Sequence, residues 1–187
     1  MPTLKVIIAS TRPGRAGLPI ANWFVEYLKK DGRYVVEVLD LEQINLPFFD
    51  EPNMPAAKRY TKEHTKKWSA AVDSADAFVV VIPEYNHTMP ATLVNAFDFL
   101  YHEWNYKPMG FVSYGGISGG TRSVQTAKVL ATTLKMMPMF EAVNIPSFNQ
   151  YMKEEKFVPV EIQEKAATKM INELLKWTVA LKTMRIK

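Results

Sequence analysis

Short apolar segments alternate with amphipathic segments along most of the chain. Five apolar segments, rich in β-branched and aromatic residues, are predicted to form buried strands: Leu4–Ala9, Tyr34–Leu39, Ala77–Ile82, Met109–Tyr114 and Phe140–Ile145. Apolar residues three or four positions apart predict helices at Leu18–Lys30, Thr61–Ser74, Pro90–Asn105, Thr121–Lys135 and Pro159–Thr183. The segment Asp40–Tyr60 has neither pattern, and a connection of this length is usually functional or mobile.

This alternation predicts an α/β protein. Strands separated by helices pair in parallel, with right-handed crossovers and with helices on both faces of the sheet. For five strands the common order is 2-1-3-4-5. Strands 1 and 3 then flank the switch point, and ligands bind there beyond the carboxyl ends of the strands. The 187 residues suit one domain, spanning residues 1–187.

Composition excludes several classes of protein. With 48% hydrophobic and 22% charged residues the chain is not intrinsically disordered, and without cysteine it has no disulfide or thiolate site. The three histidines, His64, His87 and His102, are too scattered to suggest a metal centre. No apolar run is long enough for a membrane helix, and no signal segment precedes the first strand. We therefore expect a cytoplasmic protein that does not bind membranes.

The formal net charge of +4 does not indicate a nucleic-acid partner. Most of the basic excess lies in Lys153–Lys187, where acidic residues are interspersed and aromatic residues are few. Mixed signs of this kind are typical of a solvated helix face.

Three unusual polar loops follow the first, third and fourth predicted strands. They are Ser10–Gly17, Pro83–Pro90 and Tyr114–Gly120. In the order 2-1-3-4-5 all three lie at one edge of the sheet and meet around the switch point, whereas the loops after strands 2 and 5 sit farther out. This convergence predicts a ligand site.

The first loop favours an anion. It contains the hydroxyls of Ser10 and Thr11 and the guanidinium groups of Arg12 and Arg15. It also leads into a helix N-terminus, whose unpaired N–H groups attract negative charge, and arginine binds phosphate oxygens strongly. A solvated N-cap loop is the alternative interpretation.

The other two loops favour a flat ligand. Tyr85, Asn86 and His87 follow the most apolar strand, and their aromatic, amide and backbone groups suit a planar heterocycle. A proline-bounded surface turn is the alternative.

The third loop has four glycines, which let the backbone approach a ligand closely. Gly115 and Gly120 have the spacing of a phosphate loop, but the next residue is threonine where a P-loop NTPase requires lysine.

Together the three loops resemble those of the NADPH-dependent FMN reductase family, a flavodoxin-like group of quinone, azo-dye and metal-ion reductases. The resemblance extends from about Leu4 to Ile145. Its motifs are S-x-R-x-G after the first strand, P-E-Y-N before a proline-led L-x-N-A-F-D-F-L helix, and Y-G-G-x-S-G-G after the fourth strand. The YHEW stretch Tyr101–Trp104 is similar to the quinone and azobenzene reductase branch. The resemblance implies a flavodoxin-like three-layer sandwich that binds FMN.

The resemblance also implies which residues bind FMN. The 5′-phosphate would be held by the first loop, at Ser10, Arg12, Arg15, Ala16 and Gly17. The isoalloxazine edge would lie against Pro83, Glu84, Tyr85 and Asn86, and the ring and ribityl chain along Tyr114, Gly115, Gly116 and Ser118. Many relatives have a small polar residue and an asparagine in place of Arg15 and Gly17, so whether Arg15 contacts the phosphate stays open.

The implied activity is NADPH- or NADH-dependent reduction of quinones through bound FMN in a ping-pong cycle, with azo dyes and ferric or chromate ions as weaker acceptors. The flavin carries the chemistry, so no side chain is expected to be catalytic or to bind metal. The resemblance further implies a homodimer, or a tetramer of two such dimers, that pairs through Pro90–Asn105. One internal face of that helix can hardly bury Met89, Val94 and Phe99 as well, which also favours a partner.

Three alternatives stay open. The chain could be an FMN-binding electron carrier or redox sensor without NAD(P)H turnover, although small carriers of this kind are commonly acidic. It could bind NAD directly, because Gly14, Gly17 and Asp40 partly imitate the Rossmann fingerprint, but Arg12 stands where the first glycine belongs. A non-catalytic α/β interaction domain is the third.

Overall fold

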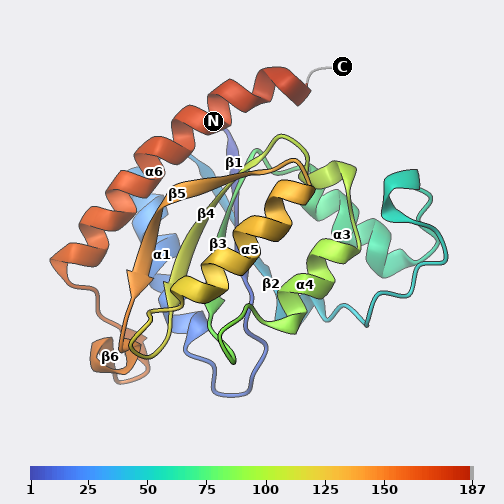
Figure 1. Cartoon of the computed structure of the whole chain (residues 1–187). Coiled ribbons are helices and arrows are strands. Elements are labelled where there is room, and N and C mark those ends of the chain that lie inside the picture. Colours follow the sequence, from blue (N-terminus) through green and yellow to red (C-terminus); the bar gives the residue numbers. More distant parts are fainter. Residues whose placement is uncertain (186–187) are drawn as a thin grey trace.

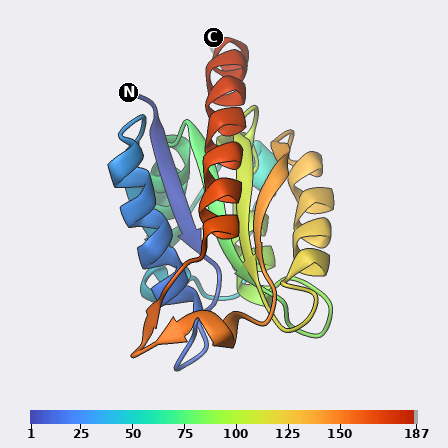
Figure 2. The same cartoon turned by 90° about the vertical axis from the view of Figure 1, so that its left-hand side faces the viewer.

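The sheet has five parallel strands in the order β2-β1-β3-β4-β5, as the sequence predicts (Figure 1). The computed structural model describes residues 1–185. The strands are β1 (Thr3–Ile8), β2 (Val35–Asp40), β3 (Ala77–Pro83), β4 (Pro108–Tyr114) and β5 (Met137–Ile145). All run in one direction, so their carboxyl ends meet at a single edge, at the bottom of Figures 1 and 2.

Helices cover both faces and complete the flavodoxin-like three-layer sandwich. One face carries α1 (Gly17–Asp31) and α6 (Glu161–Lys182), and the other carries α3 (Glu63–Asp73), α4 (Ala91–Asp98) and α5 (Thr121–Thr133) (Figure 2). Successive side chains of β3 alternate between the two faces, with Phe78 and Val80 in one core and Val79 in the other. Every residue of β3 is buried, which explains its unbroken apolar sequence.

The helix predicted over Pro90–Asn105 is wrong in length. Pro90 precedes α4 as expected, but the helix ends at Asp98, and a 3-10 turn follows at His102–Trp104. The chain turns there so that Phe99 and Trp104 are both fully buried inside the subunit. The Phe99 ring packs edge-on against Phe49 at a centroid distance of 5.2 Å. The prediction that the interior of the subunit cannot accommodate Phe99 is therefore also wrong.

The segment Asp40–Tyr60 contains more structure than its sequence predicts. It includes α2 (Leu41–Ile44) and a 3-10 turn at Pro55–Ala57. Its middle is fixed to the start of α3 by Glu51, whose carboxylate accepts hydrogen bonds from the N–H of Thr61 at 3.0 and 2.8 Å and from the N–H of Lys62 at 2.8 Å. Burial alone would raise the pKa of Glu51, but these hydrogen bonds outweigh it and lower that pKa to about 2.

A small hairpin after β5 has no counterpart in the predicted elements. It consists of β6 (Met152–Lys153) and β7 (Lys156–Phe157), and the Phe157 ring lies 5.0 Å from the ring of Trp23 in α1. The hairpin therefore lies beside the start of α1, at the same edge of the sheet as the three loops (Figure 2).

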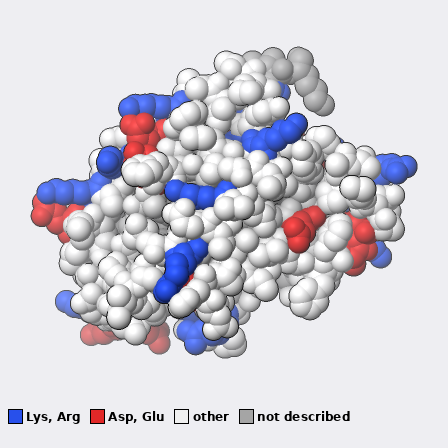
Figure 3. All heavy atoms as spheres, in the orientation of Figure 1, with Lys and Arg blue, Asp and Glu red and all other residues white. Residues whose placement is uncertain are grey.

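On the face drawn in Figure 3, basic and acidic side chains are interspersed and form no continuous basic stripe. None of the helices within residues 1–185 combines the length and apolarity needed to cross a membrane. The same residues contain no group of three or more histidine, aspartate or glutamate side chains placed to hold a metal ion.

Candidate functional site

The loops after β1, β3 and β4 meet at the carboxyl edge of the sheet, as the strand order predicts. Between them lies a hollow of about 150 Å³. Nine of the predicted site residues line it: Ser10, Arg12, Ala16, Pro83, Glu84, Tyr85, Tyr114, Gly115 and Gly116. A second hollow of about 530 Å³ adjoins it, sharing Arg12, Ala16 and Phe148, and extends along α1 toward the hairpin.

The first loop presents an anion-binding arrangement. Arg12 is exposed and has no ion-pair or side-chain hydrogen-bond partner among residues 1–185. The loop ends at Ala16, the N-cap of α1, where no side chain caps the helix, so the first N–H groups of α1 remain available to a ligand. Gly17 is buried there, and a Cβ at this position would lie 2.6 Å from the Tyr114 hydroxyl oxygen.

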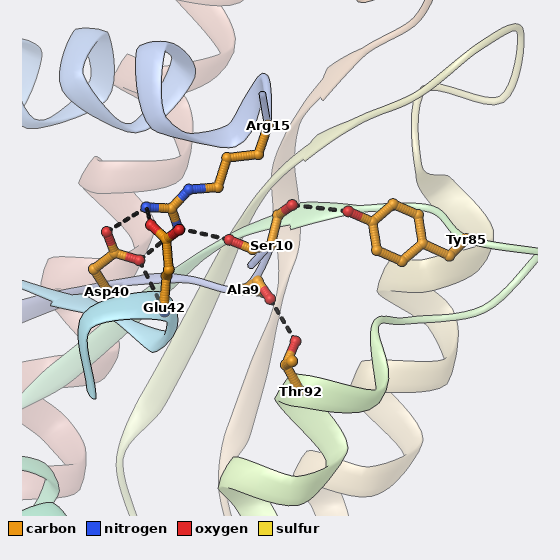
Figure 4. Close-up of polar contacts among 7 residues, drawn as sticks. All are labelled: Ala9, Ser10, Arg15, Asp40, Glu42, Tyr85 and Thr92. Atoms are coloured by element: carbon orange, nitrogen blue, oxygen red, sulfur yellow. Dashed lines mark hydrogen bonds and ion pairs between the residues drawn. The ribbon is translucent and has the colours of Figure 1, made fainter. Parts of the chain in front are cut away.

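Arg15 does not line the hollow of about 150 Å³ but lines the adjoining one of about 530 Å³, and its guanidinium is directed toward the end of β2 (Figure 4). Its guanidinium donates two parallel hydrogen bonds to the Asp40 carboxylate, at 2.5 and 2.6 Å, and a third to Glu42 at 2.6 Å. It donates a fourth to the backbone carbonyl of Ser10 at 2.6 Å. Arg15 and Asp40 are thus a buried ion pair at the base of the loop.

The second loop is a tight turn anchored to the first. Tyr85 and Thr88 exchange backbone hydrogen bonds of 3.0 Å, and both central residues, Asn86 and His87, have positive φ (49° and 67°). The Tyr85 hydroxyl is 2.8 Å from the Ser10 hydroxyl (Figure 4). The turn therefore places Tyr85 on the wall of the hollow and Asn86 at the exposed tip beside it.

Glu84 connects the second loop with the third. Its side chain is 6% exposed, and it accepts hydrogen bonds from the Ser118 hydroxyl at 2.9 Å and from Arg122 Nε at 2.7 Å. Burial acts to raise the pKa of Glu84, but the bonds from Arg122 and Ser118 prevail and lower it. Glu84 is thus held as a carboxylate by other side chains, which suits a positioning role and not proton transfer.

Glycine is required at particular points of the third loop. Gly120 has a φ of 81°, and a Cβ there would lie 2.9 Å from the backbone of Tyr114. Gly116 is different, because a Cβ at that position would meet nothing within 4 Å. Gly120 therefore shapes the loop, whereas Gly116 exposes backbone toward the hollow.

Phe148 is a lining residue that the sequence analysis did not predict. It follows β5, and its ring packs edge-on against Tyr114 at a centroid distance of 5.4 Å. Ser147 N–H donates to the Gly116 carbonyl at 2.8 Å, so the loop after β5 is fixed to the loop after β4. The expectation that this loop sits farther out is wrong, because β5 pairs directly with β4. That adjacency, already implied by the order 2-1-3-4-5, was the signal that could have identified it.

A hollow of about 780 Å³ lies at the opposite edge of the sheet, near Lys107 and Arg185. Lys107 is buried and donates hydrogen bonds of 2.8 Å to the carbonyls of Val72 and Asp73 at the end of α3. Burial lowers the pKa of Lys107 to about 8. This lysine caps a helix C-terminus, and none of the predicted site residues lies near it.

Comparison with known proteins agrees with this geometry. The family model described as NADPH-dependent FMN reductase matches residues 2–150. An NAD(P)H-dependent FMN reductase of Schizosaccharomyces pombe is 43% identical over 149 residues, which cover 78% of this chain and 74% of the relative. One of Saccharomyces cerevisiae is 36% identical over 136 residues, covering 67% and 71%. FerB, a flavoenzyme NAD(P)H:(acceptor) oxidoreductase from Paracoccus denitrificans, shares the fold with a TM-score of 0.75 at 19% identity, covering 96% of this chain and 98% of that one.

Proposed function

This chain belongs to the NADPH-dependent FMN reductase family, and from that premise we propose that it reduces quinones with electrons from NAD(P)H. Azo dyes and ferric or chromate ions are proposed as weaker acceptors. Its relatives are NAD(P)H-dependent FMN reductases, so the enzyme class is oxidoreductase and the cofactor is FMN. The quinone acceptor and a ping-pong cycle are proposals that go beyond family membership.

The donor set at the carboxyl edge of the sheet fits FMN. The guanidinium of Arg12, unpaired within residues 1–185, and the uncapped N–H groups at the start of α1 suit a phosphate. The hollow of about 150 Å³ is smaller than the roughly 300–1,000 Å³ of most ligand pockets, so it can enclose only part of a flavin nucleotide. The exposed backbone at Gly116 and the aromatic wall at Tyr85 suit the remainder.

When bound, FMN supplies the redox chemistry, namely hydride uptake from a reduced nicotinamide and onward transfer of electrons to an acceptor. The side chains of this chain would bind and orient it. Arg12 would neutralise the phosphate, while Ser10–Tyr85 and Glu84–Arg122 contacts would hold the three loops at fixed positions. Because both substrates would use the same open flavin face, each must leave before the other binds, which is the basis for the proposed ping-pong order.

The observation that most supports the proposal is the convergence of three loops on one hollow next to an unpaired arginine. The direct test is the absorption spectrum of freshly purified protein, followed by titration with FMN and FAD. Anaerobic stopped-flow mixing with NADPH or NADH then examines flavin bleaching, and steady-state rates at several concentrations of a soluble quinone should give parallel double-reciprocal lines. Purified protein that contains no FMN and binds none in the titration would overturn the proposal. Bleaching by dithionite but by neither nicotinamide would favour an electron carrier.

We further propose a homodimer that pairs beside α4, with the Pro47–Met54 segment contributing the apolar surface. Asn95 of α4 fixes this segment, donating to the Pro47 carbonyl at 2.7 Å and accepting from Phe49 N–H at 2.9 Å. Phe48 is 88% exposed on it. Phe99 is buried within the subunit, so the exposed Phe48 is the residue through which the dimer can be tested.

A further inference from the structure

Arg15 has a hydrogen-bond partner for each terminal nitrogen of its guanidinium. Nη1 donates to the Ser10 carbonyl and to Asp40 Oδ1, and Nη2 donates to Asp40 Oδ2 and to Glu42 Oε2 (Figure 4). The side chain is 7% exposed although it belongs to a surface loop. A planar fork matched to a carboxylate in this way is a strong, charge-assisted pairing with a specific geometry.

Turning Arg15 toward a bound phosphate would be costly. The guanidinium would have to leave both oxygens of Asp40, whose side chain is itself 4% exposed and would be left buried without its cation. Removing one partner of a buried ion pair is strongly destabilising. The hydrogen bonds that Arg15 donates to Asp40 are also the main reason that the pKa of Arg15 is raised, so the arginine is bound to the carboxylate as a cation.

The contacts of Arg15 fix the segment from which the phosphate loop departs. Arg15 holds the carbonyl of Ser10 from the side of β2, and Tyr85 holds the Ser10 hydroxyl from the side of β3. One residue earlier, the Thr92 hydroxyl donates to the Ala9 carbonyl at 2.6 Å (Figure 4). Asp40 is fixed in turn, because it caps α2 by accepting from the Glu42 N–H at 3.1 Å.

We propose that Arg15 is a positioning residue that anchors the phosphate loop to β2 through Asp40, and that Arg12 is the arginine that meets the phosphate. This inference rests on the proposed FMN binding and assigns two different tasks to the two arginines of the loop. Arg12 is exposed and unpaired within residues 1–185, whereas Arg15 is already neutralised. Asp40 and Glu42 thereby belong to the FMN site although neither lines the hollow.

The sign of the effect at Asp40 separates positioning from direct binding. If Arg15 bound the phosphate, Asp40→Asn would remove a competing carboxylate and tighten FMN. If Arg15 positions the loop, the same change weakens FMN, and we expect about tenfold. Asparagine keeps an oxygen that can cap α2, so the variant changes the ion pair more than the helix start.

Further variants test whether the two residues act as one unit. We expect Arg15→Lys to bind FMN nearly as weakly as Arg15→Met, because lysine keeps the charge but cannot span both Asp40 oxygens and the Ser10 carbonyl. The double variant Arg15→Met with Asp40→Asn should bind no more weakly than Arg15→Met alone. Retention of wild-type affinity by Arg15→Lys, or fully additive losses, would contradict the proposal.

A matched control uses a second bidentate arginine–carboxylate pair. Arg33 donates to Asp31 at 2.7 Å through both Nε and Nη2, at the opposite end of α1. Asp31→Asn should lower the thermal unfolding temperature of the flavin-free protein without changing FMN affinity. If Asp40→Asn fails to fold, Glu42→Gln tests the same proposal, because Glu42 also pairs with Arg15 but is half exposed, so the protein should tolerate its replacement. Weaker FMN in Glu42→Gln supports the proposal, and unchanged or tighter FMN overturns it. Wild-type protein that binds no FMN would instead refute the proposed function itself.

Discussion

Removing the Arg12 guanidinium should weaken FMN far more than riboflavin, which lacks the phosphate. Arg12 is exposed and has no ion-pair or side-chain hydrogen-bond partner within residues 1–185, so Arg12→Ala breaks no internal polar interaction of this kind and should leave the fold intact. A hydrogen bond to a charged group contributes about 1.5–3 kcal/mol, and about 1.4 kcal/mol changes a dissociation constant tenfold. FMN should therefore bind roughly ten- to a hundredfold more weakly, nearer the lower figure because solvent screens an exposed charge.

The assay is titration of flavin-free protein with FMN and with riboflavin, followed by quenching of flavin fluorescence. Arg59→Ala is the control, because Arg59 is also an exposed loop arginine but lies outside the lining of the hollow. Riboflavin affinity should stay within about twofold in both variants, and the FMN loss in Arg12→Ala should shrink at high salt. Equal losses for the two flavins, or no loss of FMN affinity, would refute the assignment of Arg12 to the phosphate.

Three further predictions concern stability and assembly. Because the pKa of Glu51 is lowered on folding, its carboxylate stabilises the protein fully above the unfolded pKa near 4.5, and this stabilisation is lost as the pH falls toward 2. Glu51→Gln should therefore lower the free energy of unfolding by about 1–3 kcal/mol at pH 7. Urea titrations at several pH values should also show a weaker acid dependence in the variant than in the wild type. Gly120→Ala should lower the free energy of unfolding by at least about 1 kcal/mol while Gly116→Ala leaves it within about 0.5, and equal effects would contradict the backbone argument. Phe48→Lys should convert the proposed dimer to a monomer of about 21 kDa in light scattering without unfolding it, and a wild-type protein that is already monomeric would end the dimer proposal.

The sheet could be predicted because each strand is a short apolar run bounded by turn residues. The strand order follows from general preferences of parallel sheets, and it is confirmed. The end of α4 could not be predicted in this way. Phe99, Leu100 and Trp104 are all buried, and a periodic apolar pattern does not distinguish a continuing helix from a turn that buries the same side chains. The predicted excess of apolar residues on α4 therefore arose because the predicted helix extended beyond the residue at which α4 ends.

Much of the candidate site was predictable from where its loops leave the sheet. Ser10, Tyr85 and Gly115 each follow a strand directly or nearly so, and parallel strands bring such positions to one edge. Phe148 was missed because nothing in its own sequence context marks it as a ligand contact. Its place in the site depends on hydrogen bonds between the loops after β4 and β5, which are tertiary contacts.

The two arginines of the first loop show where sequence reasoning stops. Both have the chemistry to bind a phosphate, and their spacing from Ser10 does not separate them. The difference comes from β2, because its register with β1 places Asp40 beside Ile8, next to the segment that Arg15 holds. Asp40, at the carboxyl end of a neighbouring strand and 25 positions away in the sequence, thus gives Arg15 a partner within the protein. Arg12 is left as the arginine of the loop that has no partner within residues 1–185. The Asp40→Asn experiment measures that difference directly. If Arg15 acts through Asp40, the protein loses FMN affinity when the carboxylate is neutralised, whereas an arginine that bound the phosphate itself would bind it more tightly.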